Sequence, residues 1–167
     1  MQQILVLDEK NYTENMPVFE KTGVRAIIEK DGLFAMQKSS RGEYKIPGGG
    51  VDVGETLEEA LLREVQEEVG LQVIPESMEE LGEILEMRRD IFNKELKYIA
   101  HSLHYLCKVK DERVETCMTE SETRRGFHLS WVDIDTVIAA NEALMSEKWQ
   151  LRDVEFLKWY KEKYKKS

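Results

Sequence analysis

Short apolar runs that suit β-strands fill much of the chain and are separated by polar turn residues. Residues 23–39 predict a hairpin, because two apolar segments flank the turn dipeptide Asp31-Gly32. Residues 81–109 are also β-rich, and their second half alternates apolar and polar side chains like one long strand. Further strands are expected within residues 4–8, 43–47, 71–74 and 126–134.

The first stretch with helical spacing covers residues 57–69. Thr56 precedes it and forms a capping box with Glu59, three residues later. Gly70 supplies a natural end, because glycine readily adopts the left-handed conformation that closes a helix. The sequence therefore predicts a helix with both of its ends specified.

Two more helices are expected toward the C-terminus. Asp133 is placed to cap one over residues 134–144, and an amphipathic helix is expected over residues 147–165. The apolar positions of the latter include Trp149, Val154, Leu157 and Tyr160. Its aromatic side chains favour core or dimer packing over a nucleotide platform. Strands mixed with three helices predict an α+β fold, an α/β/α sandwich, and the length fits a single domain over residues 1–167.

Composition narrows the class of protein. The formal net charge of the 167 residues is −9, which argues against binding a nucleic acid polymer, since that needs a basic face. No run approaches the ~18 apolar residues of a membrane span, and the first residues lack the basic region of a signal peptide. Cys107 and Cys117 have no disulfide or zinc spacing. We expect a cytoplasmic protein that does not bind membranes.

Three glutamates crowd one edge of the first predicted helix. On a helical wheel Glu64 and Glu68 border the apolar arc, and Glu67 lies beside them. Like charges four residues apart destabilise a helix, and only Glu67 has a cation one turn away, Arg63. A hard divalent cation such as Mg²⁺ or Mn²⁺ would neutralise these acids. The alternative is a solvated acidic face.

A glycine-rich loop at residues 48–54 leads into this helix. Glycine allows the backbone to approach a ligand closely, whereas a simple turn into the helix would need fewer glycines. Residues 49–71 resemble the Nudix box, G-x5-E-x7-R-E-U-x-E-E-x-G-U with U apolar, at every specified position. The resemblance implies a mixed β-sheet between helices and a hydrolase that cleaves a diphosphate linked to another group, usually a nucleoside.

The resemblance also implies roles for individual residues. Glu64, Glu67 and Glu68 are expected to bind Mg²⁺ or Mn²⁺, together with the backbone carbonyl of Gly48. Arg63 is expected to pair with Glu55 and orient the helix. The general base varies within the family. Acids from a later loop often assist, and here Glu120 and Glu122 are available, of which Glu122 is preferred.

The substrate is less closely specified. Some Nudix subfamilies carry a proline or a tyrosine downstream of the box, where this chain has Met87. A nucleoside triphosphate is therefore the default, with nucleotide sugars, dinucleotides or coenzyme A as alternatives and a non-catalytic nucleotide-binding module as another. Candidate substrate contacts are Arg41, Tyr44, Arg88 and Arg89, with Lys38 as a further cation. Alternatively, the four cations are ordinary surface charge and Tyr44 is a strand residue without contact to a ligand. The resemblance also suggests a homodimer.

A metal site formed by the two nearby histidines is disfavoured. His101 and His104 are three apart in a predicted strand, so they are expected on opposite faces of the sheet.

Overall fold

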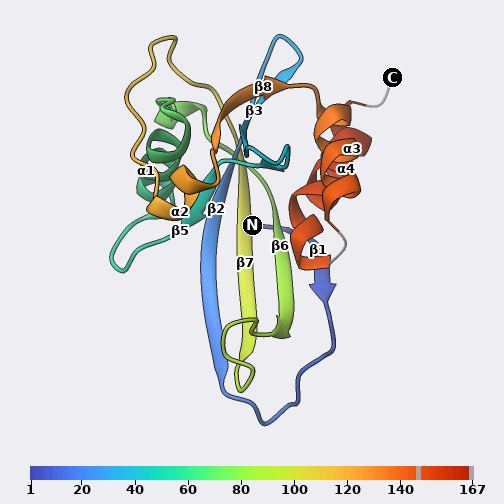
Figure 1. Cartoon of the computed structure of the whole chain (residues 1–167). Coiled ribbons are helices and arrows are strands. Elements are labelled where there is room, and N and C mark those ends of the chain that lie inside the picture. The colour runs from blue at the N-terminus through green and yellow to red at the C-terminus, as the bar shows by residue number, and fades with distance from the viewer. Residues whose placement is uncertain (146–147, 166–167) are drawn as a thin grey trace.

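The computed structural model, which describes residues 1–145 and 148–165, places a mixed sheet between two helical layers (Figure 1). The strands run in the order β1-β6-β7-β2-β3-β4, with β5 paired to β2 and β8 paired to β3. They are β1 (Gln3–Asp8), β2 (Val18–Lys30), β3 (Leu33–Lys38), β4 (Tyr44–Lys45), β5 (Gly48–Gly50), β6 (Glu79–Arg89), β7 (Lys97–Cys107) and β8 (His128–Val132). β1 is parallel to β6 and β2 to β7, and the other pairs are antiparallel.

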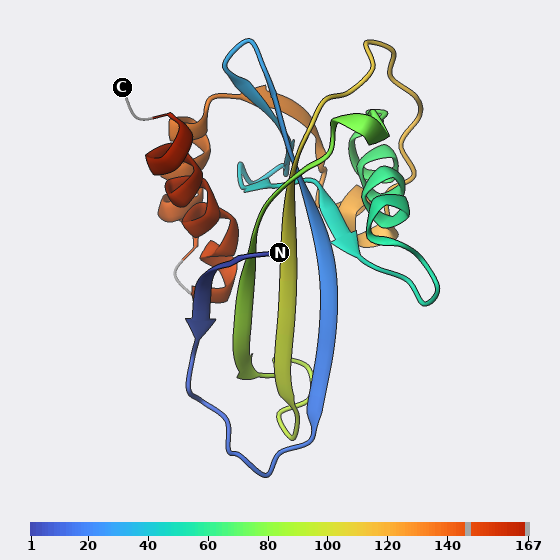
Figure 2. The same ribbon diagram turned by 180° about the vertical axis from the view of Figure 1, so that it is seen from behind.

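Helix α1 covers one side of the sheet, and α3 and α4 lie together on the other (Figures 1 and 2). The helices are α1 (Leu57–Val69), α2 (Glu120–Arg124), α3 (Ile134–Leu144) and α4 (Arg152–Tyr164), with 3₁₀ turns at Pro75–Ser77 and Lys148–Leu151. None of the helices in the described part of the chain is long and apolar enough to cross a membrane. This arrangement confirms the predicted α/β/α sandwich.

Alternation along β2 divides the core between the two faces. Val24 and Ala26 are buried against α1, whereas Ile27 is buried with Phe156 and Leu157 of α4. Because successive strand residues point to opposite faces, one strand supplies both cores. Its position between β7 and β5 also brings the glycine-rich segment next to a fully buried part of the sheet.

Most predicted boundaries are confirmed. Asp31 and Gly32 turn the hairpin with positive φ angles of 54° and 80°. Thr56 and Glu59 form both bonds of the capping box, and Gly70 ends α1 with φ 69°. Asp133 caps α3 through the amide of Thr136.

Three expectations need correction. Residues 71–74 form no strand, because only Val73 makes a bridge, to Val109, before a proline starts a 3₁₀ turn. The glycine loop contains β5, and the short helix α2 was not predicted. The C-terminal helix predicted over residues 147–165 is divided, because a 3₁₀ turn precedes α4. Residue 147, the first of the predicted range, lies outside the described residues.

Candidate active site

The strand β5, hereafter the glycine strand, brings α1 into contact with the sheet edge. It pairs antiparallel with Gly23–Arg25 of β2. Gly48 has φ 149°, and a Cβ there would lie 1.9 Å from the carbonyl oxygen of Val24. A Cβ on Gly49 would lie 2.5 Å from the carboxyl group of Glu64. Gly48 therefore has to be glycine for the strand to pair with β2, whereas a side chain at Gly49 would displace the Glu64 carboxyl group of α1.

Arg63 connects α1 to the glycine strand and to the loop that follows it. Its guanidinium donates to both carboxylate oxygens of Glu55, at 2.7 and 2.9 Å, and to the Gly50 carbonyl at 3.1 Å. The hydrogen bond from Arg63 lowers the pKa of Glu55 to about 2. Arg63 also contacts Glu64 at 3.0 Å and Glu67 at 3.3 Å. Glu64 therefore has a counter-ion, contrary to the expectation from helical spacing.

Glu68 is buried where the helix meets the glycine strand. Its carboxylate accepts from the amide of Gly48 at 2.7 Å, and Lys45 lies 4.0 Å away. Burial raises the pKa of Glu68 to about 8, against the attraction of Lys45. Glu68 is thus largely protonated at neutral pH in the metal-free protein, which leaves a carboxyl group that a cation would ionise.

Helix α2 brings Glu122 beside Glu68. Lys45 lies 3.9 Å from Glu122, and Gln37 donates to it at 3.3 Å. Burial opposes the ionisation of Glu122, but hydrogen bonds from Glu68 and from the Thr119 amide outweigh it, so the pKa of Glu122 is lowered. The proton of the pair therefore resides on Glu68, and Glu122 is the ionised member. We call Glu64, Glu67, Glu68 and Glu122 the carboxylate cluster.

Two cations in this region were not identified from the sequence. Arg25 donates to the Gly48 carbonyl at 3.2 Å, and burial lowers the pKa of its guanidinium. Lys45 lies between Glu68 and Glu122. Arg25 could have been noticed in the sequence, because it is the one charged residue in the apolar run of residues 24–28. Nothing comparable distinguishes Lys45 from the other lysines.

The donor atoms of the cluster suit a hard divalent cation. Burial raises the pKa of both Glu64 and Glu68, so the site disfavours its own ionised acids. Across the described residues, no three His, Cys, Asp or Glu side chains converge closely enough to enclose a metal ion by themselves. Mg²⁺ usually keeps several water ligands and takes only one or two carboxylates. The residues therefore fit a partly hydrated cation rather than an all-protein cage.

The predicted substrate contacts do not gather at this site. Arg41 is exposed in the turn between β3 and β4. Tyr44 is only 5% exposed and packs in the core beneath α3 and α4, so its ring offers no face to a ligand. The Arg89 guanidinium donates to the carbonyls of Asn11 and Lys94 at 2.9 and 3.0 Å, which ties two loops together. Arg88 lies over the Tyr98 ring, 4.2 Å from its centroid.

The two histidines lie on opposite faces of β7, as their spacing predicts. His104 is buried and stacks on Phe156 of α4, with 3.7 Å between ring centroids. His101 is hydrogen-bonded between Glu83 and Glu20 of the neighbouring strands.

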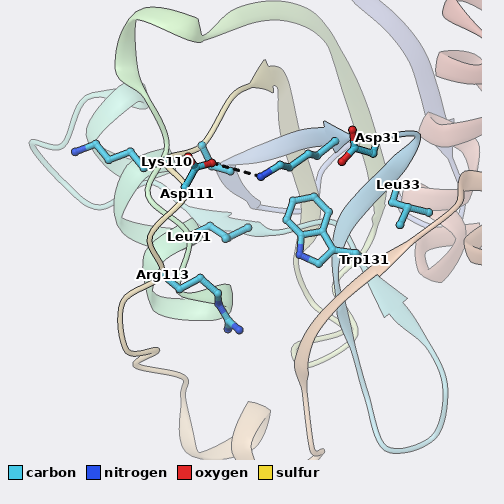
Figure 3. A pocket seen from close by; sticks show the side chains of 9 residues that line it. Asp31, Leu33, Leu71, Lys110, Asp111, Arg113 and Trp131 are labelled. Carbon is cyan, nitrogen blue, oxygen red and sulfur yellow. Dashed lines mark hydrogen bonds and ion pairs between the residues drawn. The ribbon is translucent and has the colours of Figure 1, made fainter.

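A separate pocket of about 380 Å³ lies beyond the C-terminal end of α1 (Figure 3). Lys30 and Asp111 pair across it at 3.5 Å. The charged ends of Lys110 and Arg113 point away from it in Figure 3, and Arg113 donates to the Val69 carbonyl at 3.1 Å. Its charges therefore do not converge on a common ligand position.

The fold and the box residues together define the class of protein. A family model described as the NUDIX domain matches residues 20–160, so the chain belongs to the Nudix family. Nudix proteins generally use divalent metal cations.

Particular relatives agree with this assignment. The nucleoside triphosphatase NudI of Salmonella schwarzengrund is 41% identical over 61 residues, and an Escherichia coli NudI is 39% identical over the same length. Each alignment covers 33% of this chain and 43% of the relative, so it spans less than half of those proteins.

Solved structures share the fold across more of the chain. A Nudix hydrolase from Nitrosomonas europaea has a TM-score of 0.58 at 20% identity, covering 82% of this chain and 87% of its own. A MutT Nudix hydrolase from Burkholderia pseudomallei has a TM-score of 0.52 at 25% identity, covering 70% of this chain and 85% of its own. Both support the mixed sheet between helices.

Proposed function

We propose that this chain is a metal-dependent pyrophosphohydrolase that converts a nucleoside triphosphate, with ribose or deoxyribose, to a monophosphate and pyrophosphate. The observation that carries the proposal is the pairing of the buried Glu68 with the half-buried Glu122 beside the glycine strand, next to Glu64 and Glu67. A polyphosphate would be repelled by this cluster unless a cation lay between them. The nucleoside triphosphatase activity named for the NudI relatives supports this substrate class.

Each residue of the cluster has a distinct part in the proposal. Glu64, Glu67, Glu68 and the Gly48 carbonyl would hold Mg²⁺ or Mn²⁺. The bound cation would lower the pKa of a water ligand and neutralise charge on the phosphoryl oxygens. Glu122, whose pKa is lowered, would be ionised near neutral pH and would accept a proton from water. Arg63 positions α1 by holding Glu55 and the Gly50 carbonyl.

A substrate panel tests the proposal. The purified protein is incubated with Mg²⁺ or Mn²⁺ and with ribo- and deoxyribonucleoside triphosphates, nucleotide sugars, ADP-ribose, coenzyme A or dinucleotides. Chromatography then identifies the products. We expect nucleoside monophosphate and pyrophosphate from a triphosphate. Preferred turnover of another member would favour an alternative substrate class. No turnover of any member, with metal binding intact, would leave a non-catalytic binding module.

The substitution Glu68→Gln tests the site itself. The glutamine side chain has the same shape, and its amide oxygen can still accept the hydrogen bond from the Gly48 amide. It cannot ionise, however. We expect turnover to fall by about 10²-fold or more. Glu58→Gln is the matched control, because Glu58 is an exposed residue on the first turn of the same helix. Wild-type turnover in the Glu68 variant would remove Glu68 from the metal ligands.

A further inference from the structure

An open pocket of about 400 Å³ lies at the end of the sheet farthest from the β2–β3 turn. Phe19, Tyr98 and Arg88 lie in register across its floor, on β2, β7 and β6. Residues directly opposite on neighbouring strands present side chains to the same face. Neither helical layer extends over this end of the sheet (Figures 1 and 2). We call it the aromatic pocket.

The floor of the aromatic pocket carries two aromatic rings and a guanidinium group. Phe19 and Tyr98 are nearly parallel, with centroids 5.9 Å apart and an interplanar angle of 16°. The Arg88 guanidinium lies 4.2 Å from the Tyr98 centroid, and Arg88 is only 9% exposed. Phe19 remains 48% exposed beside this packed base. One aromatic surface is thus held firmly while its outer part stays open.

A second ring is displayed on the β6–β7 turn. Phe92 lines the pocket and is 92% exposed. The turn that carries it is ordered, because the Asp90 amide donates to the Leu96 carbonyl at 2.9 Å and the Asn93 amide to the Asp90 carboxylate at 2.8 Å. An exposed phenylalanine contributes little to the stability of the fold. Its place on an ordered turn beside a pocket points to a ligand.

The aromatic pocket adjoins the glycine strand. Lys21 also lines the pocket, and its Cε lies 3.0 Å from where a Cβ on Gly50 would be. The Gly50 carbonyl in turn accepts from Arg63. Phe19 is four residues along β2 from Gly23, the partner of Gly50, a separation of about 13 Å at ~3.3 Å per residue. One extended ligand can therefore contact both places.

We propose that the aromatic pocket binds the heterocyclic base of the substrate, which stacks on Phe19 and Phe92 while the phosphates lie along the glycine strand. This inference rests on the proposed function. Lys21 lies between the two ends and would contact the phosphate chain. Every base has a ring face, so stacking discriminates weakly between bases. We therefore expect the site to accept several bases.

Equilibrium binding tests the proposal without requiring turnover. Isothermal titration calorimetry with Mg²⁺ measures the affinity of an α,β-methylene nucleoside triphosphate and, separately, of pyrophosphate. We expect Phe19→Ala and Phe92→Ala each to weaken nucleotide binding relative to pyrophosphate binding by about fivefold or more, the size of one base–aromatic contact. Leu33→Ala is the control, because it removes an exposed apolar side chain at the β2–β3 turn.

The outcomes separate this inference from the proposed function. Pocket-dependent binding without hydrolysis of any nucleotide would support the base site and contradict the proposed reaction. Hydrolysis with unchanged nucleotide affinity in both variants would overturn the base site alone. If affinity is unchanged and sedimentation shows that a wild-type dimer dissociates in the variants, the exposed rings belong to a dimer interface. Wild-type protein that binds no nucleotide would overturn both proposals.

Discussion

At the scale of single side chains, the protonation of Glu68 links the stability of the metal-free protein to pH. Its pKa rises from an ordinary 4.5 to about 8 in the folded state. Between these values the folded state binds more protons than the unfolded state. The contribution of this group to stability is therefore complete below about pH 4.5 and declines as pH rises through 8.

Glu68→Gln should remove that dependence. The amide resembles the protonated acid in shape and charge, so we expect the variant to match the wild type within about 1 kcal/mol near pH 4.5, where the wild-type contribution is complete. Near pH 9 the variant should be the more stable protein, because the wild type then carries a buried carboxylate. Urea denaturation in the presence of EDTA at both pH values measures the difference. Parallel pH dependence in the two proteins would contradict the assignment.

His101 should contribute a second pH dependence. The hydrogen bond to Glu83, assisted by Glu20, raises the pKa of His101 above its ordinary 6.5. The protonated ring stabilises the folded state fully below pH 6.5, and this contribution is lost as pH rises through the raised value. We expect His101→Gln to flatten this decline in denaturation experiments. His128→Gln, at an exposed position, is the control and should leave it in place.

The sequence predicts side-chain partners well where they lie on one element. Arg63 meets Glu67 because four residues make one helical turn, and the box resemblance places Glu55 beside it. Arg25 and Lys45 were not predicted, since their partners come from β5, α1 and α2. Tyr44 was a candidate contact for a base, with a strand position as the alternative. It lies in the strand β4, and the face its ring occupies depends on where α3 and α4 pack.

At the scale of elements, α3 and α4 hold the chain that leads into the glycine strand. Asn141 of α3 accepts from the amide of Tyr44 at 2.8 Å and donates to its carbonyl at 2.9 Å, as a paired strand would. Asp153 of α4 accepts from the Ile46 amide at 3.0 Å. These bonds satisfy backbone groups of a two-residue strand that has few other partners. They fix the chain just before Gly48, where the glycine strand begins.

Asp153→Ala should therefore destabilise the whole fold. The change leaves the Ile46 amide unsatisfied and removes the anion 3.1 Å from the Arg152 guanidinium. We expect a loss on the order of 3 kcal/mol, as when one partner of a buried ion pair is removed. Urea denaturation measures it. Asp135→Ala, which breaks the exposed pair with Lys161, should change stability by less than about 1 kcal/mol. Equal losses would contradict the role given to Asp153.

Element prediction succeeds where local signals are complete. Helix α1 carries its cap, its apolar face and its terminal glycine in sequence, so both boundaries are predictable. The glycine strand has no such signal, because glycine has a low strand propensity. Its three glycines form a strand because the backbone of β2 is available beside them for pairing. Residues 71–74 carry strand-like side chains, yet only Val73 finds a partner, Val109.

At the scale of the whole molecule, net charge and site charge act in the same direction. The formal charge of −9 and the carboxylate cluster both oppose the binding of a polyphosphate. Arg25, Lys45 and Arg63 offset part of the local charge, but each is already engaged by the glycine strand or by acids of the site. A divalent cation is the simplest means of completing the balance. Single-domain folding, predicted from length, makes the global stability a suitable reporter of its binding.

Magnesium should therefore stabilise the folded protein through the carboxylate cluster. A ligand that binds only the folded state at ten times its dissociation constant raises the free energy of unfolding by about 1.4 kcal/mol. We expect this increase for the wild type and for Glu58→Gln, and its loss in Glu68→Gln or after EDTA is added. Because a proton competes for Glu68, the increase at a fixed magnesium concentration should be larger at pH 8.5 than at pH 6.5. A magnesium effect of equal size in the Glu68 variant would place the cation elsewhere on this acidic chain.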